Sequence, residues 1–295
     1  MRHPSRRLHY ESMPPPNTLQ CIICGSDACF SFAKRFDMHG LGTVDYWRCE
    51  ACGFTQSRTH ADMTGATWEA LNATSHAAYQ GTDADPGDPR WRTRLAAQAR
   101  VLDDAASLGL LDAEGRWLDY ACGDGKLADA LARNHARRLL KYDRYMGRAT
   151  GYLREGALAP GGFDLVITTS VFEHLMHRAD FDAIHGLVSP SGVLGIHTLV
   201  CETVPDDPSW FYLVPVHCAF HTNRSMQVLF EQWGYTCSVY SVAAQLWLWF
   251  RTDPAAIEHI VSGANARAED QPKYLFKRGF VDYWKGSPLL RAGGA

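Results

Sequence analysis

The sequence lacks the long hydrophobic runs and the surplus of one charge that mark membrane and nucleic-acid-binding proteins. Its most apolar stretch, LWLWF at 246–250, is far shorter than a membrane span. The 29 basic and 32 acidic residues give a net charge of −3, which argues against a protein whose main task is to grip a nucleic-acid backbone. The first 17 residues are basic without an apolar core, so we expect no secretory signal and a cytoplasmic location.

What remains is the composition of an ordinary globular protein, with 46% hydrophobic and 21% charged residues. A chain of 295 residues has room for one large domain and a small module. A run rich in helix-breaking residues, GTDADPGDPR, separates the two. In chain order, we expect a flexible tail over 1–18, a cysteine-bearing module over 19–59, a linker over 60–90, a large domain over 91–253 and a C-terminal extension over 254–295.

Four of the nine cysteines form two C-x-x-C pairs, Cys21 with Cys24 and Cys49 with Cys52, separated by 24 residues. The two-residue spacer lets both sulfurs of a pair turn toward one ion, and two pairs complete a tetrahedral set that suits Zn²⁺. With four protein ligands the ion has no open position, so we interpret it as structural. The module resembles a zinc ribbon. The alternative is four ordinary cysteines, whereas a redox dithiol needs only one pair.

From residue 117 onward, strand-like and helix-like segments alternate. This pattern predicts right-handed strand–helix–strand units and hence a parallel sheet with helices on both faces. Two strand-like runs near the end, YTCSVYSV and LWLWFRT, lie close enough in sequence to form a hairpin, which adds an antiparallel strand.

The segment LDYACGDGKLADA at 118–130 combines a strand, a tight turn and the start of a helix. Gly123, Gly125 and Ala128 have the G-x-G-x-x-A spacing of a nucleotide-binding turn, which fits either a dinucleotide or S-adenosylmethionine. Asp119, just before the turn, suits a cationic ligand because a buried carboxylate is costly without a positive partner. Asp143 ends the next strand and could accept the ribose hydroxyls of either cofactor.

Several motifs together resemble the class I S-adenosylmethionine-dependent methyltransferase family. They are LDYACGDG, YD at 142–143, FDLVITTSVFEHL and LVSPSGVLGIHT, and the likeness covers roughly 91–251. The cysteine-bearing front is similar to that of members with an N-terminal zinc-binding domain, including sugar C-methyltransferases. The resemblance implies a Rossmann-like α/β fold, with a mostly parallel seven-stranded sheet and a terminal antiparallel hairpin strand.

The resemblance also implies which residues bind the cofactor. The turn would shape the methionine end of the site, Asp143 would bind the ribose, and the end of the fourth strand would lie near the sulfonium. The full set is Asp119, Tyr120, Ala121, Gly123, Gly125, Asp143, Arg144, Thr169, Ser170 and Val171. The chain departs from the family at Ala121, where glycine is common. It also departs over 143–163, which is too short for a full second helix.

Methyl transfer to a hydroxyl or an acidic carbon needs a base, and histidine is the usual one near neutral pH. Glu173 and His174 follow the fourth strand, at the sheet edge where α/β folds bind ligands. His217 and His221 follow the fifth strand, and we expect one of these two to be the base. The alternative is that these histidines brace the next helix or order a loop.

We therefore predict methyl transfer from S-adenosylmethionine to a small molecule, a sugar or a biosynthetic intermediate, on oxygen or carbon. One alternative is an RNA methyltransferase that holds its substrate with the zinc ribbon. The acidic balance opposes it, and so does the lack of an N/D-P-P-Y/F segment after the fourth strand. The other alternative is an NAD-dependent oxidoreductase, which only the glycine spacing favours. We expect neither a nucleic-acid nor a membrane partner, and the oligomeric state stays open.

Overall fold

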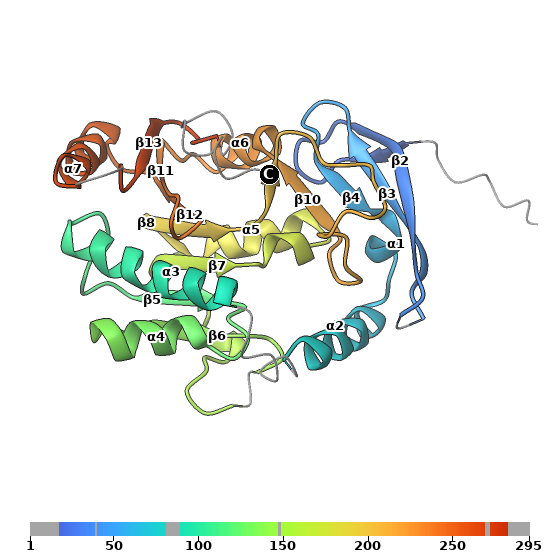
Figure 1. Ribbon diagram of the computed structural model, residues 1–295, viewed down its shortest axis with the longest axis horizontal. Coiled ribbons are helices and arrows are strands. Elements are labelled where there is room, and N and C mark those ends of the chain that lie inside the picture. Colours follow the sequence, from blue (N-terminus) through green and yellow to red (C-terminus); the bar gives the residue numbers. More distant parts are fainter. Residues whose placement is uncertain (1–17, 39, 81–88, 147–148, 269–271, 283–295) are drawn as a thin grey trace, which may run out of the picture.

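The computed structural model describes residues 18–38, 40–80, 89–146, 149–268 and 272–282, and contains two sheets (Figure 1). The expected tail, apart from Thr18, lies outside the described residues, as does most of the run GTDADPGDPR. Within the described residues, no helix is long and apolar enough to cross a membrane.

The larger sheet has seven strands in the order β13-β11-β12-β8-β7-β5-β6. Strands β6, β5, β7 and β8 run parallel, and every pairing from β8 to β13 is antiparallel. The strands are β5 (Trp117–Tyr120), β6 (Leu140–Tyr142), β7 (Phe163–Thr169), β8 (Val188–His197), β11 (Cys237–Ser241), β12 (Leu246–Phe250) and β13 (Leu275–Arg278). The expected methyltransferase-like α/β fold is confirmed, but the sheet is mixed. The hairpin supplies two strands, and β13 comes from the expected extension.

Two apolar clusters cover the two faces of this sheet. Side chains alternate along a strand, so Leu165 and Ile167 of β7 pack on one face, while Val166 packs on the other. The first face is covered by α3 (Pro89–Ser107), α4 (Lys126–His135) and α7 (Pro254–Ala266), and the second by α5 (Arg178–Gly186) and α6 (Asn223–Gln232).

The chain between β6 and β7 is short, as expected from its length. Its described residues form a 3-10 turn, η2 (Glu155–Ala157), in place of a full second helix. A single parallel bridge joins Lys141 to Tyr152, where a further strand would extend the sheet. The sheet therefore ends at β6, beside the glycine turn.

The smaller sheet has six strands in the order β1-β2-β3-β4-β10-β9 and is built from two segments that are far apart in the sequence. The N-terminal module supplies β1 (Thr18–Gln20), β2 (Asp27–Phe36), β3 (Gly42–Cys49) and β4 (Thr55–Ser57). The methyltransferase part supplies β9 (Val200–Cys201) and β10 (Ala219–Thr222). Strand β10 pairs with β4 in antiparallel register, with Ala219 opposite Gln56 and Phe220 opposite Thr55.

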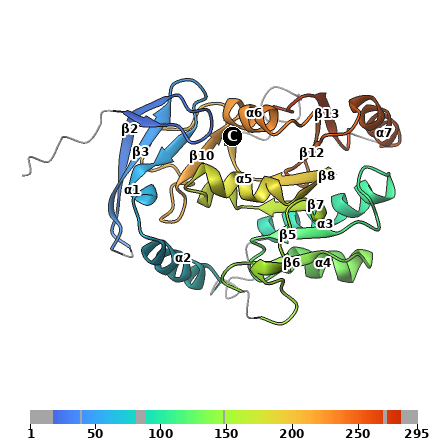
Figure 2. The ribbon, with the colours of Figure 1, turned by 180° about the vertical axis from the view of Figure 1, so that it is seen from behind.

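The residues expected as a linker are largely helical. The short helix α1 (Arg58–Ala61) is followed by α2 (Gly65–Gln80). Figures 1 and 2 both show α2 between the module and the end of β6. There, Glu69 of α2 forms an ion pair of 2.9 Å with Arg144. This segment therefore borders the expected cofactor site.

The two C-x-x-C turns contact the rest of the protein differently. Gly25 and Gly53 each follow a cysteine pair, with left-handed φ angles of +78° and +71°. A Cβ atom on Gly25 would meet no described atom within 4 Å, but one on Gly53 would lie 2.9 Å from Cγ2 of Thr222. Thr222 is fixed because its hydroxyl donates to the Cys52 carbonyl. The second turn therefore packs directly against the methyltransferase part.

These two glycines make a matched test of that contact. Gly25→Ala places alanine in a left-handed conformation and should lower the free energy of unfolding by about 1 kcal/mol. Gly53→Ala adds steric overlap with Thr222, which should cost about 1–3 kcal/mol more. Chemical denaturation of both variants measures the difference. Equal losses of stability would contradict close packing between the second turn and Thr222.

Candidate functional site

The candidate site lies at the carboxyl ends of the parallel strands, on the side of the larger sheet that faces the module. The chain leaves β7 through Ser170 and Val171 and forms the 3-10 turn η3 (Phe172–His174). The Glu173 carbonyl accepts a hydrogen bond of 2.9 Å from the amide of Cys218, which directly precedes β10. This bond joins the segment that follows β7 to the smaller sheet.

The glycine turn adopts the conformation that its sequence predicts. Gly123 and Gly125 have φ angles of +53° and +74°. A Cβ atom on Gly125 would overlap the side chain of Lys141, and the left-handed φ also favours glycine there. Ala121, where the family commonly has glycine, also has a left-handed φ of +55°. Left-handed backbone is strained for alanine, and such strain is typical of functional sites.

Asp119 is the most deeply buried acid of the turn, with 1% of its surface exposed. Its Oδ1 atom has no hydrogen-bond partner among the described residues. Burial, together with the charges of Asp143 and Asp124, raises the pKa of Asp119 to about 8. A buried carboxylate oxygen without a partner fits a ligand that brings its own positive charge, as S-adenosylmethionine does.

Asp143 ties the glycine turn to the loop after β6. Its Oδ2 accepts a hydrogen bond of 2.9 Å from the amide of Gly123. Its Oδ1 accepts from the amides of Tyr145 and Met146 at 2.9 and 3.2 Å. Asp143 therefore lies at the strand end where the ribose acid was expected, and it also holds the turn in place.

The remaining expected cofactor residues lie on adjacent strand ends. The Tyr120 ring packs against the Tyr142 ring at 5.1 Å. Thr169 ends β7, and Ser170 follows it with a left-handed φ of +58°. The Ser170 amide donates to the carbonyl of His197 at the end of β8. Val171 is buried beneath this edge.

Glu173, His174 and His217 come together beside this edge. The two imidazole rings meet edge to face with centroids 4.9 Å apart. His174 donates through Nδ1 to the Val216 carbonyl at 2.9 Å, and His217 donates through Nδ1 to the Tyr212 carbonyl at 2.8 Å. A carbonyl can only accept, so both rings carry their hydrogen on Nδ1 when neutral.

Glu173 is buried, with 1% of its surface exposed, yet it is held as a carboxylate. Tyr212 donates its hydroxyl to Oε1 at 2.6 Å, and Thr198 donates to Oε2 at 2.9 Å. Burial alone would raise the pKa of Glu173. The nearby His174 and His217 and the tyrosine hydrogen bond outweigh burial, so its pKa lies below the usual value. Burial lowers the pKa of His217.

His221 occupies a different environment from His217. It is 1% exposed and lies among the rings of Phe54, Phe172 and Phe181, with centroids 5.0, 5.8 and 5.7 Å away. Burial lowers the pKa of His221 to about 4. Because Phe54 belongs to the module, His221 packs between the two parts of the protein. Of the two histidines after the fifth strand, His217 is the one that meets Glu173 and His174.

Two residues of this site were not among the expected catalytic set. Thr198 directly follows β8, and Tyr212 belongs to an aromatic run that we noted only as a candidate loop. Tyr212 connects two members of the cluster, because its hydroxyl holds Glu173 while its carbonyl holds His217. The sequence gives little sign of the contact between Tyr212 and Glu173, because the two residues are 39 positions apart.

The module holds the loop that carries Tyr212 and His217. An apolar cluster joins Phe36 and Val44 of the module to Val204 and Leu213 of the loop. Polar contacts add to it. Lys34 donates to the Leu213 carbonyl, Arg48 to the Val204 carbonyl and His60 to the Pro215 carbonyl.

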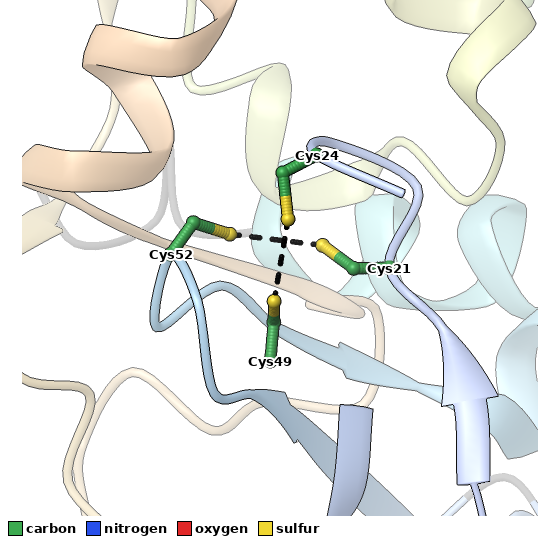
Figure 3. A group of neighbouring side chains, drawn as sticks. All are labelled: Cys21, Cys24, Cys49 and Cys52. Carbon is green, nitrogen blue, oxygen red and sulfur yellow. Dashed lines mark hydrogen bonds between the residues drawn. The ribbon is translucent and has the colours of Figure 1, made fainter. Parts of the chain in front are cut away.

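The four cysteines of the two pairs converge at one end of the module (Figure 3). Their sulfur atoms all lie within 4.8 Å of one another, with Cys21 3.7 Å from Cys52 and Cys24 3.4 Å from Cys49. Zn–S bonds of about 2.3 Å in a tetrahedron place sulfurs roughly 3.8 Å apart. The cluster therefore has the dimensions of a four-thiolate metal site.

A family model described as a methyltransferase domain matches residues 90–238, half of the chain. The chain therefore belongs to the methyltransferase-domain family, and it is an S-adenosylmethionine-dependent methyltransferase. This decides against the oxidoreductase alternative for the glycine turn. No curated protein matches the chain.

The chain is also similar to solved structures of low sequence identity. One is 1,6-didemethyltoxoflavin-N1-methyltransferase of Burkholderia thailandensis, at 14% identity and a TM-score of 0.42, covering 74% of this chain and 97% of that one. Another is DesVI of Streptomyces venezuelae, at 17% identity and a TM-score of 0.41, covering 58% and 98%. A third is the plantazolicin methyltransferase BpumL, at 10% identity and a TM-score of 0.39, covering 63% and 98%.

Proposed function

We propose that this methyltransferase transfers the methyl group of S-adenosylmethionine to a hydroxyl oxygen or an acidic carbon of a small molecule, such as a sugar or a biosynthetic intermediate. The observation that carries the proposal is the group of Glu173, His174 and His217 at the carboxyl edge of the sheet. An alcohol or an acidic C–H must lose a proton to accept a methyl group, and a half-buried imidazole close to a carboxylate can promote that loss.

His217 is the favoured base. Its Nδ1 hydrogen is held by the Tyr212 carbonyl, so the lone pair lies on Nε2. The buried Glu173 carboxylate stabilises the imidazolium that forms when His217 takes a proton. S-adenosylmethionine is already activated, so the remaining task of the protein is to align the acceptor atom with the methyl carbon and the sulfur.

The cofactor would lie along the strand ends next to this group. Asp119 would face the positive charges of the methionine end, and Asp143 would accept from the ribose while it keeps the turn in place. Tyr120, Arg144, Thr169 and Val171 would border the cofactor. The left-handed backbone at Ala121 and Ser170 would allow the chain to approach it closely.

We propose that the four cysteines hold a structural Zn²⁺ ion and that the module positions the loop that carries Tyr212 and His217. Two of the three basic side chains on the β2–β3 hairpin, Lys34 and Arg48, donate to loop carbonyls, and the third, Arg35, pairs with Asp37. Basic groups engaged in this way favour a module that supports the loop over one that grips RNA. A small acceptor is therefore favoured over a nucleic acid.

Asp119→Asn tests the cofactor site. The apo carboxyl is neutral below pH 8 and must lose its proton to pair with a cationic ligand. Affinity for S-adenosylmethionine should therefore rise from pH 6 to pH 8, by up to about tenfold per unit. The asparagine variant should bind about tenfold or more weakly at pH 8, without this pH dependence. Isothermal titration calorimetry measures both, with Glu258→Gln on α7 as control. Unchanged affinity in Asp119→Asn would refute this assignment.

His217→Asn tests the base. Turnover should fall about 100-fold or more, because general-base catalysis contributes at least that much. Cofactor affinity should stay as in the wild type. The assay follows S-adenosylhomocysteine formation over a panel of hydroxylated small molecules, with His259→Asn on α7 as control. Since burial lowers the pKa of His217, the wild-type rate should hold at neutral pH and fall only below about pH 6.5. Full activity in His217→Asn would rule out its role as base.

A further inference from the structure

We propose that Glu173, His174 and His217 form a second metal site, which takes a divalent transition-metal ion. Each residue offers one ligand atom, and the three atoms lie within 4.8 Å of one another. Two imidazoles and one carboxylate are a common ligand set for divalent first-row metals. The site is distinct from the four cysteines, whose ligands are all sulfur.

The hydrogen bonds around these three side chains are those that orient metal ligands. Metal-bound histidines commonly donate their other ring hydrogen to a backbone carbonyl, and ligating carboxylates are themselves hydrogen-bonded. His174 and His217 donate to the carbonyls of Val216 and Tyr212. Glu173 accepts from the hydroxyls of Tyr212 and Thr198. With Nδ1 donating to a carbonyl, Nε2 is the atom through which each ring would bind an ion.

The distances also suit one ion after small side-chain rotations. Ligands bound at about 2.1 Å lie roughly 3–4 Å apart around a metal. Glu173 and His174 are adjacent in η3, and His217 is fixed by the loop that the module holds. Only the side chains need to move, because the backbone already brings them to one place.

The charge of Glu173 favours a cation at this position. A carboxylate with 1% of its surface exposed is costly to bury without a positive partner. Among the described residues, Glu173 forms no ion pair with a lysine or an arginine. Its two hydroxyl donors bring no charge, and the His174 and His217 rings bring one only when they are protonated. A divalent ion held by two neutral imidazoles supplies that charge.

A bound ion would change how the acceptor loses its proton. Three protein ligands leave open coordination positions, which an acceptor oxygen could fill. A metal-bound oxygen acid has a lowered pKa, so in the metal-loaded protein the ion would acidify the acceptor in place of the metal-free His217 base. This consequence rests on the proposed function and narrows the acceptor to a molecule that binds through oxygen. The metal binding itself does not rest on it.

Manganese binding tests the proposal directly. Full-length protein is first brought to one zinc per chain by mild chelation, and Mn²⁺ is then titrated while electron paramagnetic resonance follows the free ion. Mn²⁺ prefers oxygen and nitrogen ligands, so it should not displace zinc from four thiolates. We expect one Mn²⁺ per wild-type chain. Binding should be about tenfold or more weaker in Glu173→Gln, His174→Asn and His217→Asn.

His259→Asn, at an exposed position on helix α7, is the matched control and should bind Mn²⁺ as the wild type does. Circular dichroism and zinc content show which variants keep their fold, and any one folded ligand variant suffices. No Mn²⁺ binding to the wild type, or equal binding in folded ligand variants, overturns the proposal. Calorimetry of the wild-type protein with S-adenosylhomocysteine separates the metal site from the proposed function. A wild type that binds Mn²⁺ but not S-adenosylhomocysteine would refute the proposed function and leave the metal site intact.

Discussion

The antiparallel pairing of β4 with β10 is the contact on which the site depends. Residues 55 and 56 of the module pair with residues 219 and 220, just after the loop that carries Tyr212 and His217. The Ser57 amide extends the contact to the Cys218 carbonyl, and the Cys218 amide in turn reaches Glu173. The cysteine turn, the module strand, the loop and the end of β7 are therefore connected by consecutive hydrogen bonds. The module is part of the site's framework.

Two buried carboxylates define the two halves of the site. Asp119 has one oxygen without a partner among the described residues, and its pKa is raised. Both features suit a carboxyl group that ionises when a cationic cofactor binds. Glu173 has two hydroxyl donors and a lowered pKa, so it is charged before any ligand binds. Because β7 lies beside β5 in the sheet, these two environments adjoin. The methyl donor and the acceptor would therefore meet between Asp119, which must ionise to bind the cofactor, and Glu173, which is already ionised.

Short-range features of the sequence predicted their structures well. The cysteine spacing, the glycine turn and the alternation of strands and helices each reflect local geometry, and the family match supports the resulting methyltransferase. The sequence did not indicate that β9 and β10 would complete the module's sheet, because strand pairing between distant segments leaves no local pattern. Tyr212 and Thr198 were missed for the same reason, since their partner Glu173 is distant in the chain. The histidines after the fifth strand looked equivalent, and only packing among phenylalanine rings distinguishes His221.

The most direct test of whether the module holds the loop that carries Tyr212 and His217 is hydrogen exchange. It compares the full-length protein with and without the Cys49→Ser substitution. If the cysteine cluster supports β4 and thereby β10, loss of one thiolate should increase amide exchange over residues 199–222. Strands β5 and β7, in the centre of the larger sheet, should keep wild-type protection. Unchanged exchange over 199–222 in a variant that does not bind zinc, beside a wild type that does, would contradict the account, because the loop would then be ordered without an intact cysteine cluster.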